Sequence, residues 1–276
     1  MSRIRTTLGL AAGPFRRRQG PRVFGVGAAK TGTHSLAALF ADRVPSAHEA
    51  DARRLIRLHL AREQTGDDRR LRLALRLRDR LRGLAVDASQ VNLYLAADLV
   101  ALFPDARFVL TLRPPLSWLR SMIDDSLRRE VDPVWLRFRA YRFRPPPDAA
   151  PGWPEAEEPL RAAGLHRLDG YLDHWRSAIE RVQAAVPAKR LLVVRTEELG
   201  ARSAEIAAFC GIGGGAATGQ AHAFANPTRF GVLARVPEAH LLGVADRRCG
   251  ALARRLFPER DLGADVAAIR RVDAAG

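Results

Sequence analysis

The sequence predicts an α/β fold of three layers, in which helices cover both faces of a central parallel sheet. Short apolar runs alternate along the chain with longer segments of helical periodicity. The clearest run, residues 106–113 (ARFVLTLR), is apolar almost without a break, as is typical of a strand that helices cover on both faces. With 47% hydrophobic and 27% charged residues, the 276-residue chain can bury a sizeable core.

Four segments are expected to form strands. The first lies between Pro21 and a glycine turn, the second ends in polar residues, and the third and fourth are apolar runs that end near Arg113 and Glu198. The four expected strands are residues 22–27, 83–89, 106–113 and 190–199. In a parallel sheet, ligands bind beyond the carboxyl ends of the strands, so the residues after these segments are the candidates for a site.

Helices are expected between and after these strands. The turn QTGDD separates two of them, Pro104 ends another, and Pro115 suits the start of the next because its missing N–H is not needed there. One helix begins near Thr33, and the others span residues 49–63, 67–82, 92–103, 115–130, 168–186 and 236–257, the last interrupted at Gly250. Residues 143–159, rich in proline, glycine and acid, are expected to form a loop or lid, and residues 211–219 to be flexible.

Residues 21–276 are expected to form one domain, preceded by a disordered or loosely attached basic segment, residues 1–20. Cys210 and Cys249 show neither metal spacing nor a disulfide framework, which favours a cytoplasmic protein. No apolar run approaches the length of a membrane span, so stable membrane insertion is not expected.

The net charge of +15 comes almost entirely from arginine, since Lys30 and Lys189 are the only lysines. Most arginines lie in amphipathic helical segments and are expected to be solvated, while their field would attract an anionic ligand. Neither a nucleic-acid-binding motif nor an aromatic-interleaved basic patch is present, so no nucleic-acid partner is expected.

The segment GAAKTGTHS, residues 27–35, has the features of an anion site at a turn from strand to helix. Backbone N–H groups from Ala29 to Thr33 can point at one anion, aided by the helix N-terminus and by the hydroxyls of Thr31 and Thr33. A loop that binds nucleoside triphosphates places its lysine after the last glycine, whereas Lys30 precedes Gly32 here. No later strand ends in an aspartate that could help to hold Mg²⁺, so the site is expected to work without a metal.

At this point the sequence resembles the sulfotransferases that use 3′-phosphoadenosine-5′-phosphosulfate (PAPS). GAAKTGTHSL (27–36) matches their motif G-x-x-K-[ST]-G-[ST], and FVLTLRPPLSWLRS matches a strand that ends in arginine, Arg113, followed by a serine, Ser121. LLVVRTEEL (191–199) echoes a third element, and the resemblance spans roughly residues 22–200. One departure is Pro114, which stands where the family usually has aspartate or asparagine, so a helix cap is lost. The resemblance implies a fold like that of the P-loop NTPases.

The resemblance also implies a role for each matching residue. Lys30 would stabilise the oxygen that bridges phosphorus and sulfur, and Arg113 and Ser121 would bind the 3′-phosphate. Arg229 and Phe230, in NPTRFGVLARVP (226–237), would contact phosphate and adenine. The loop around the 5′-phosphosulfate would comprise Gly27, Ala28, Ala29, Lys30, Thr31, Gly32, Thr33, His34 and Ser35.

The acceptor must lose a proton, so the site needs a base. In the branches of the family that modify glycans and tyrosine this base is a glutamate soon after the first helix, which here implies Glu49, with His48 as the second choice. The alternative is that HEAD (48–51) forms only the polar start of the next helix and has no catalytic role. The residues expected to orient the acceptor are Asp87, Ser89, Asn92 and Trp153.

The sequence therefore predicts transfer of a sulfuryl group from PAPS to a hydroxyl or amine of a small-molecule or glycan acceptor. Two alternatives stay open: a metal-dependent nucleotide kinase or NTPase with a phosphate loop, and a non-catalytic module that binds anions. Carbohydrate, phenolic natural product, lipid head group and peptide all remain possible acceptors, because acceptor pockets are built from variable loops. The sequence does not predict the oligomeric state.

Overall fold

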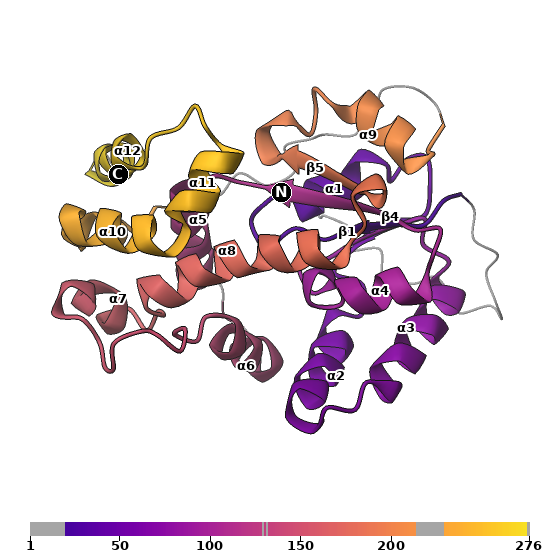
Figure 1. The fold of residues 1–276 in the computed structure, drawn as a ribbon, viewed down its shortest axis with the longest axis horizontal. Helices are drawn as coiled ribbons and strands as arrows, with labels where there is room; N and C mark the ends of the chain where they lie inside the picture. Colours follow the sequence, from indigo (N-terminus) through magenta and orange to yellow (C-terminus); the bar gives the residue numbers. More distant parts are fainter. Residues whose placement is uncertain (1–19, 129, 131, 214–228, 275–276) are drawn as a thin grey trace, which may run out of the picture.

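The computed structural model describes residues 20–128, 130, 132–213 and 229–274. A parallel sheet in the order β2-β3-β1-β4-β5 forms the centre of the molecule (Figure 1). Its strands are β1 (Val23–Gly25), β2 (Ser46–His48), β3 (Val86–Ala88), β4 (Arg107–Leu112) and β5 (Leu191–Arg195). Because β3 and β4 lie on opposite sides of β1, the chain changes direction across the sheet there. Such a switch point opens a crevice at the carboxyl ends of the strands.

Helices cover the two faces of the sheet and form two separate cores. Side chains alternate along β1, so Val23 packs with α1 (Thr33–Leu39) and α9 (Ser203–Cys210). Phe24 faces the opposite side, where α4 (Ala96–Leu102) and α8 (Leu168–Ala185) lie (Figure 1). Each large apolar side chain that such a layer buries contributes about 1.5–3 kcal/mol. The three-layer α/β/α fold predicted from the sequence is confirmed.

The remaining helices extend these layers. The C-terminal group packs beside α8 and α5, with α10 against α8 and α12 against α5 (Figure 1). These helices are α2 (Ala52–Thr65), α3 (Arg69–Arg82), α5 (Pro115–Arg128), α6 (Pro133–Arg142), α7 (Glu158–Ala162), α10 (Glu238–Ala245), α11 (Ala251–Leu256) and α12 (Leu262–Ala274). Single 3-10 turns lie at Asn92–Tyr94, Glu155–Glu157, Ala188–Arg190, Thr196–Glu198 and Leu233–Arg235.

All four expected strands are present, but one strand was not expected. The strand β2 pairs with β3 over only three residues and has no apolar run of its own, so its sequence carries no strand signal. Helices α6, α9 and α12 also lie in segments for which the sequence analysis predicted no element.

Two expected helices contain irregular turns. Residues 92–103 form a 3-10 turn followed by α4, and residues 236–257 form α10, a π-helical turn at Asp246–Gly250 and α11. Gly250 ends this π-helical turn, and a Cβ atom there would lie 2.4 Å from Asp246 Oδ1. Of the flexible segment expected at 211–219, and of the expected lead-in 1–20, only residues 211–213 and 20 lie within the described part of the chain. The boundaries of the domain stay a prediction.

Candidate active site

The loop between β1 and α1 is tied to the ends of the neighbouring strands. The Thr31 hydroxyl donates to Ala28 O at 2.7 Å and lies 2.8 Å from Thr111 Oγ1 on β4. Thr196, just after β5, donates to Thr31 O at 2.7 Å and to Leu112 O at 2.8 Å. The Thr31 hydroxyl, expected to face an anion, is therefore turned into the fold, where it fixes the shape of the loop.

Three carbonyl groups of the loop accept hydrogen bonds from side chains, which orients the amides that follow them. Ala28 O accepts from Thr31 Oγ1, Ala29 O accepts from Trp118 Nε1 at 2.8 Å, and Thr31 O accepts from Thr196. In a trans peptide the C=O and the next N–H point in opposite directions. The amides that follow, those of Ala29, Lys30 and Gly32, therefore point away from these hydrogen-bond partners.

The amides that follow these carbonyls are those of Ala29, Lys30 and Gly32. Among the residues that the structure describes, none accepts a hydrogen bond from them. Unpaired N–H groups of this kind are a ready site for an oxyanion. That this loop binds an anion stays a prediction.

Backbone strain in the loop has identifiable causes. Lys30 has φ +66° and Gly32 has φ +97°, both in the left-handed region. At Gly27 a Cβ atom would lie 2.0 Å from Thr111 Oγ1, so only glycine fits beside β4. Lys30, Glu49 and Asp51 are the only non-glycine residues with positive φ in the described part of the chain. All three follow the carboxyl ends of β1 and β2, and strain of this kind concentrates at functional sites.

The ammonium group of Lys30 is held by helix α5. Lys30 Nζ lies 3.2 Å from Asp125 Oδ1, which also accepts from Arg128 Nη2 at 3.2 Å. The Lys30 side chain is mostly buried, with 16% of its surface exposed. Asp125 therefore restrains the ammonium group.

A group of three guanidinium ions lies at the end of β4. Arg113 donates from Nε to Ser117 Oγ at 3.1 Å. Burial, followed by the charges of Arg120 and Arg229, lowers the pKa of Arg113, while Glu197 opposes this effect. Cations that repel one another in a partly buried position favour an oxyanion between them. Ser121 is buried on the same helix, α5.

Arg229 and Phe230 reach the same helix from the C-terminal part of the chain. Asp124 accepts from Phe230 N at 3.3 Å and lies 3.5 Å from Arg229 Nη1. Burial raises the pKa of Asp124. The Phe230 ring keeps 40% of its surface exposed, so it is available to a ligand. Residues 226–228 of the predicted segment lie outside the described residues.

Glu49 follows β2 on the other side of the loop. Its carboxylate accepts from Gln90 N at 3.1 Å and from Ser89 Oγ at 3.0 Å. Burial raises the pKa of Glu49, although these hydrogen bonds oppose the shift. His48 Nε2 lies 3.2 Å from Thr33 Oγ1 and 3.8 Å from Glu49 Oε1, so His48 connects the loop to the carboxylate.

The rings of His34 and His48 lie side by side, with their centroids 4.9 Å apart. His34 is the second residue of α1 and Ser35 the third, so both follow the loop directly. The structure thus brings the predicted lysine, the predicted base and His48 to one edge of the sheet.

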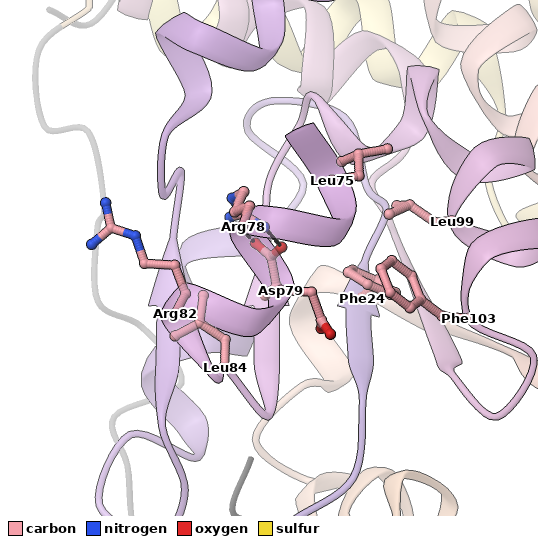
Figure 2. Close-up of a pocket in the computed structure, with 9 residues that line it drawn as sticks. Phe24, Leu75, Arg78, Asp79, Arg82, Leu84, Leu99 and Phe103 are labelled. Carbon is pink, nitrogen blue, oxygen red and sulfur yellow. Dashed lines mark hydrogen bonds and ion pairs between the residues drawn. The ribbon is translucent and has the colours of Figure 1, made fainter. Parts of the chain in front are cut away.

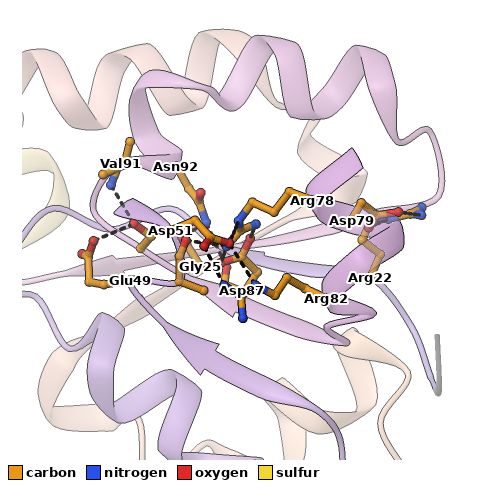
Figure 3. A network of polar contacts seen from close by, with 12 residues as sticks. Arg22, Gly25, Glu49, Asp51, Arg78, Asp79, Arg82, Asp87, Val91 and Asn92 are labelled. Atoms are coloured by element: carbon orange, nitrogen blue, oxygen red, sulfur yellow. Dashed lines mark hydrogen bonds and ion pairs between the residues drawn. The ribbon is translucent and has the colours of Figure 1, made fainter. Parts of the chain in front are cut away.

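Asp87 and Asn92 hold the strands together beneath this edge (Figure 3). Arg78 of α3 binds both carboxylate oxygens of Asp87, with Nη2 3.0 Å from Oδ1. Asn92 Nδ2 donates to Asp87 O at 2.9 Å and to Gly25 O at 3.3 Å. Both side chains are buried and saturated with protein partners, whereas we expected them to orient an acceptor.

Ser89 holds Glu49 directly, and Trp153 lies apart from it. The Trp153 side chain is 38% exposed in the loop before α7. Within the described residues no hydrogen bond or ring contact joins Trp153 to Glu49 or Lys30. The four residues expected to orient the acceptor therefore do not form one cluster.

Sequence reasoning missed four residues that shape this site: Trp118, Arg120, Asp125 and Thr196. A signal for two of them was present in α5. Polar residues recur there at spacings of three and four, which places them on one face of a helix that is otherwise buried. Trp118 and Thr196 carried no signal, because their role is to bind carbonyls that are distant in sequence.

The cavity in Figure 2 lies against α3 and α4, away from the loop. Its volume is about 10 Å³, which is at most room for one water molecule. Its walls include Phe24, Leu75, Asp79, Leu84, Leu99 and Phe103. It is too small to bind a nucleotide or an acceptor.

The described residues include neither a cluster of metal ligands nor a membrane-spanning helix. They contain no group of three or more His, Cys, Asp or Glu side chains placed to hold a metal ion. No helix among them is both long and apolar enough to cross a bilayer.

Residues 22–211 match the sequence model of the family described as "Sulfotransferase domain". The chain belongs to the sulfotransferase family. The match runs from β1 past the end of α9, so it includes every strand, the loop and α5. Helices α10, α11 and α12 lie beyond it. The family predicted from the two motifs is confirmed, and with it a transferase.

Among solved structures, the chain is similar to the crystal structure of a sulfotransferase from Alicyclobacillus acidocaldarius. The two are 18% identical, and the alignment covers 90% of this chain and 99% of that chain with a TM-score of 0.49. No curated protein matches the chain.

Proposed function

We propose that this sulfotransferase takes the sulfuryl group from PAPS and transfers it to a hydroxyl or amine of a small-molecule or glycan acceptor. The observation that carries the proposal is the loop after β1, where the amides of Ala29, Lys30 and Gly32 have no acceptor among the described residues and Lys30 supplies an ammonium group. This arrangement suits a group whose negative charge grows on one oxygen during the reaction.

The residues present fit both ends of PAPS. The loop from Gly27 to Ser35 supplies amides for the 5′-phosphosulfate, and Arg113 with Ser121 lies at the end of β4 for the 3′-phosphate. Arg229 and Phe230 approach the same helix and would add a cation and an aromatic face for the adenine. Lys30 and the cations near Arg113 would together bind a ligand that carries anions at two positions.

The chemistry follows from where each side chain lies. Lys30 would leave Asp125 and stabilise the phosphate oxygen from which the sulfuryl group departs, so that adenosine 3′,5′-bisphosphate is released. Glu49 would accept the proton of the acceptor as the new bond to sulfur forms. Its raised pKa makes the carboxylate a stronger base than an exposed glutamate. His48 would orient the Glu49 carboxylate or share its proton.

We also place the reaction in the cytoplasm. Cys210 and Cys249 are both free and buried, and burial raises the pKa of each thiol to about 12. Two unpaired thiols are typical of a reducing compartment.

The direct test is incubation with PAPS and a broad panel of acceptors, followed by mass spectrometry for the gain of one sulfuryl group. In parallel, adenosine 3′,5′-bisphosphate with a chelator should raise the melting temperature, as ligands of the native state do. Stabilisation by Mg-ATP alone would instead indicate a metal-dependent kinase or NTPase. Binding of the bisphosphate without any sulfated product would indicate a non-catalytic module.

A further inference from the structure

Arg142 is a buried cation beside the proposed base. It is the last residue of α6, and 8% of its surface is exposed. Its Nη1 donates to the side-chain oxygen of Gln90, whose backbone N–H binds Glu49. The guanidinium therefore lies one residue away from the carboxylate that would receive the proton of the acceptor.

No carboxylate among the described residues forms an ion pair with Arg142. Its Nε is buried without a hydrogen-bond partner. The guanidinium lies over the ring of Phe143 at 4.5 Å and near the ring of Phe138 at 5.5 Å, so apolar groups occupy two sides. A buried cation is costly unless an anion and further hydrogen bonds compensate it.

Burial shifts the pKa of two histidines and two tyrosines near Arg142 toward the neutral form, while Arg139 adds a second cation. Burial, then the charge of Arg142, lowers the pKa of His166 to about 4 and that of His174 well below its usual value. Burial raises the pKa of the Tyr94 and Tyr171 phenols. Burial, and then the charge of Arg139, lowers the pKa of Arg142, whereas the carboxylate of Glu49 raises it, while burial raises the pKa of Glu49 itself.

We infer that Arg142 binds an oxyanion of the acceptor, so that the preferred acceptors carry a carboxylate, sulfate or phosphate near the hydroxyl or amine that is sulfated. This inference rests on the proposed function. It adds a substrate class, because a fork of N–H groups held by Gln90 beside Glu49 fixes how far the anion lies from the reacting group. The incoming anion would give Arg142 the ion-pair partner that it lacks among the described residues.

A different role for Arg142 predicts a different result. Its charge lowers the pKa of Glu49, so it could serve only to tune the base. In that case replacement of Arg142 would change the reaction with every acceptor to the same extent. Only a contact with the acceptor would separate anionic acceptors from neutral ones.

The test uses matched acceptor pairs: para-hydroxybenzoate and para-hydroxybenzamide, glucuronate and glucuronamide, glycerol phosphate and glycerol. Dissociation constants are measured by calorimetry on the full chain saturated with adenosine 3′,5′-bisphosphate, so the readout does not require turnover. In at least one pair, we expect the anionic member to bind at least about tenfold more tightly than the neutral member. The first two pairs identify a carboxylate as the preferred anion, and the third a phosphate.

Arg142→Met should abolish this preference, and Arg144→Met should keep it. Arg144 is the matched control, because it lies two residues away, is exposed and stacks on Tyr141 at 4.7 Å. Arg142→Met should melt no lower than the wild type, since methionine suits the space between Phe138 and Phe143. Arg142→Lys, which keeps the charge but loses the fork, should give an intermediate preference.

Equal binding of both members in every pair would overturn the inference, as would an equal loss for both members in Arg142→Met. Failure of Arg142→Met to fold would also count against it, because it would show that the cation supports the fold. If adenosine 3′,5′-bisphosphate does not bind, the proposed function fails whatever the pairs show. If it binds and the pairs do not differ, this inference alone fails.

Discussion

Lys30 is the residue on which the proposed chemistry depends most. The chain uses arginine almost everywhere else, and Lys189 is the only other lysine. Lys30→Met should lower kcat by about 10²–10³, as removal of one donor to a developing oxyanion does. Because the amides of the loop remain, the affinity for adenosine 3′,5′-bisphosphate should change much less.

Lys189→Met is the matched control, since Lys189 is exposed in the turn before β5. Steady-state kinetics and calorimetry on both variants separate kcat from affinity. A Lys30→Met enzyme with unchanged kcat would contradict the proposed role of the ammonium.

Glu49 gives the reaction a predictable dependence on pH. A base must be ionised, and the raised pKa of Glu49 means that activity is lost on acidification at a pH above about 4.3, the ordinary glutamate value. Glu49→Gln should abolish most of the transfer while it keeps the affinity for the bisphosphate. The measurement is kcat/KM against pH, and an acid limb at the ordinary glutamate value would contradict the assignment.

The same shift predicts an effect of Glu49 on stability. Its pKa is higher in the folded than in the unfolded chain, so the folded state binds more protons and its stability falls as pH rises through the folded-state pKa. In Glu49→Gln this contribution is absent. The loss of melting temperature between about pH 4 and about pH 8 should therefore be smaller than in the wild type.

At the scale of elements, the shape of the loop after β1 depends on hydrogen bonds from β4, from α5 and from the turn after β5. Gly27→Ala would place a Cβ atom 2.0 Å from Thr111 Oγ1 and 2.5 Å from Thr31 Oγ1. The loop would have to move away from β4, at a cost of about 1–3 kcal/mol for overpacking. We expect a lower free energy of unfolding and a large loss of affinity for the bisphosphate.

Gly213→Ala provides the control, because nothing lies within 4 Å of a Cβ atom at that position. Denaturant titrations of both variants, with and without ligand, measure the two effects. If Gly27→Ala bound the bisphosphate as well as the wild type, the tight contact with Thr111 would have no functional role.

The sequence predicted the elements that carry strong local signals and missed those that depend on distant partners. The residues of β4 alone predict a buried strand, whereas β2 is a strand only because Ala47 and His48 pair with β3. The resemblance to the family points to Lys30, Arg113 and Glu49, and their roles stay predictions. The ion pair between Arg78 and Asp87 could not be predicted in this way, because Arg78 lies on α3. From the sequence alone, any polar residue after a strand is a candidate for binding a ligand.

At the scale of the whole molecule, the net charge of +15 should accelerate capture of the anionic donor. Charges beyond a Debye length, about 10 Å at 0.1 M salt, are screened. Raising NaCl from about 20 mM to about 500 mM should therefore lower kcat/KM for PAPS severalfold and leave kcat nearly unchanged.

Local and overall charge can be told apart with single substitutions. Arg120→Gln, beside Arg113, and Arg76→Gln, exposed on α3, remove the same charge from different places. If the cations at the end of β4 receive the 3′-phosphate, Arg120→Gln should reduce the salt dependence and kcat/KM much more than Arg76→Gln. Equal effects would mean that the overall field captures the donor and that the three guanidinium ions near Arg113 do not form its phosphate site.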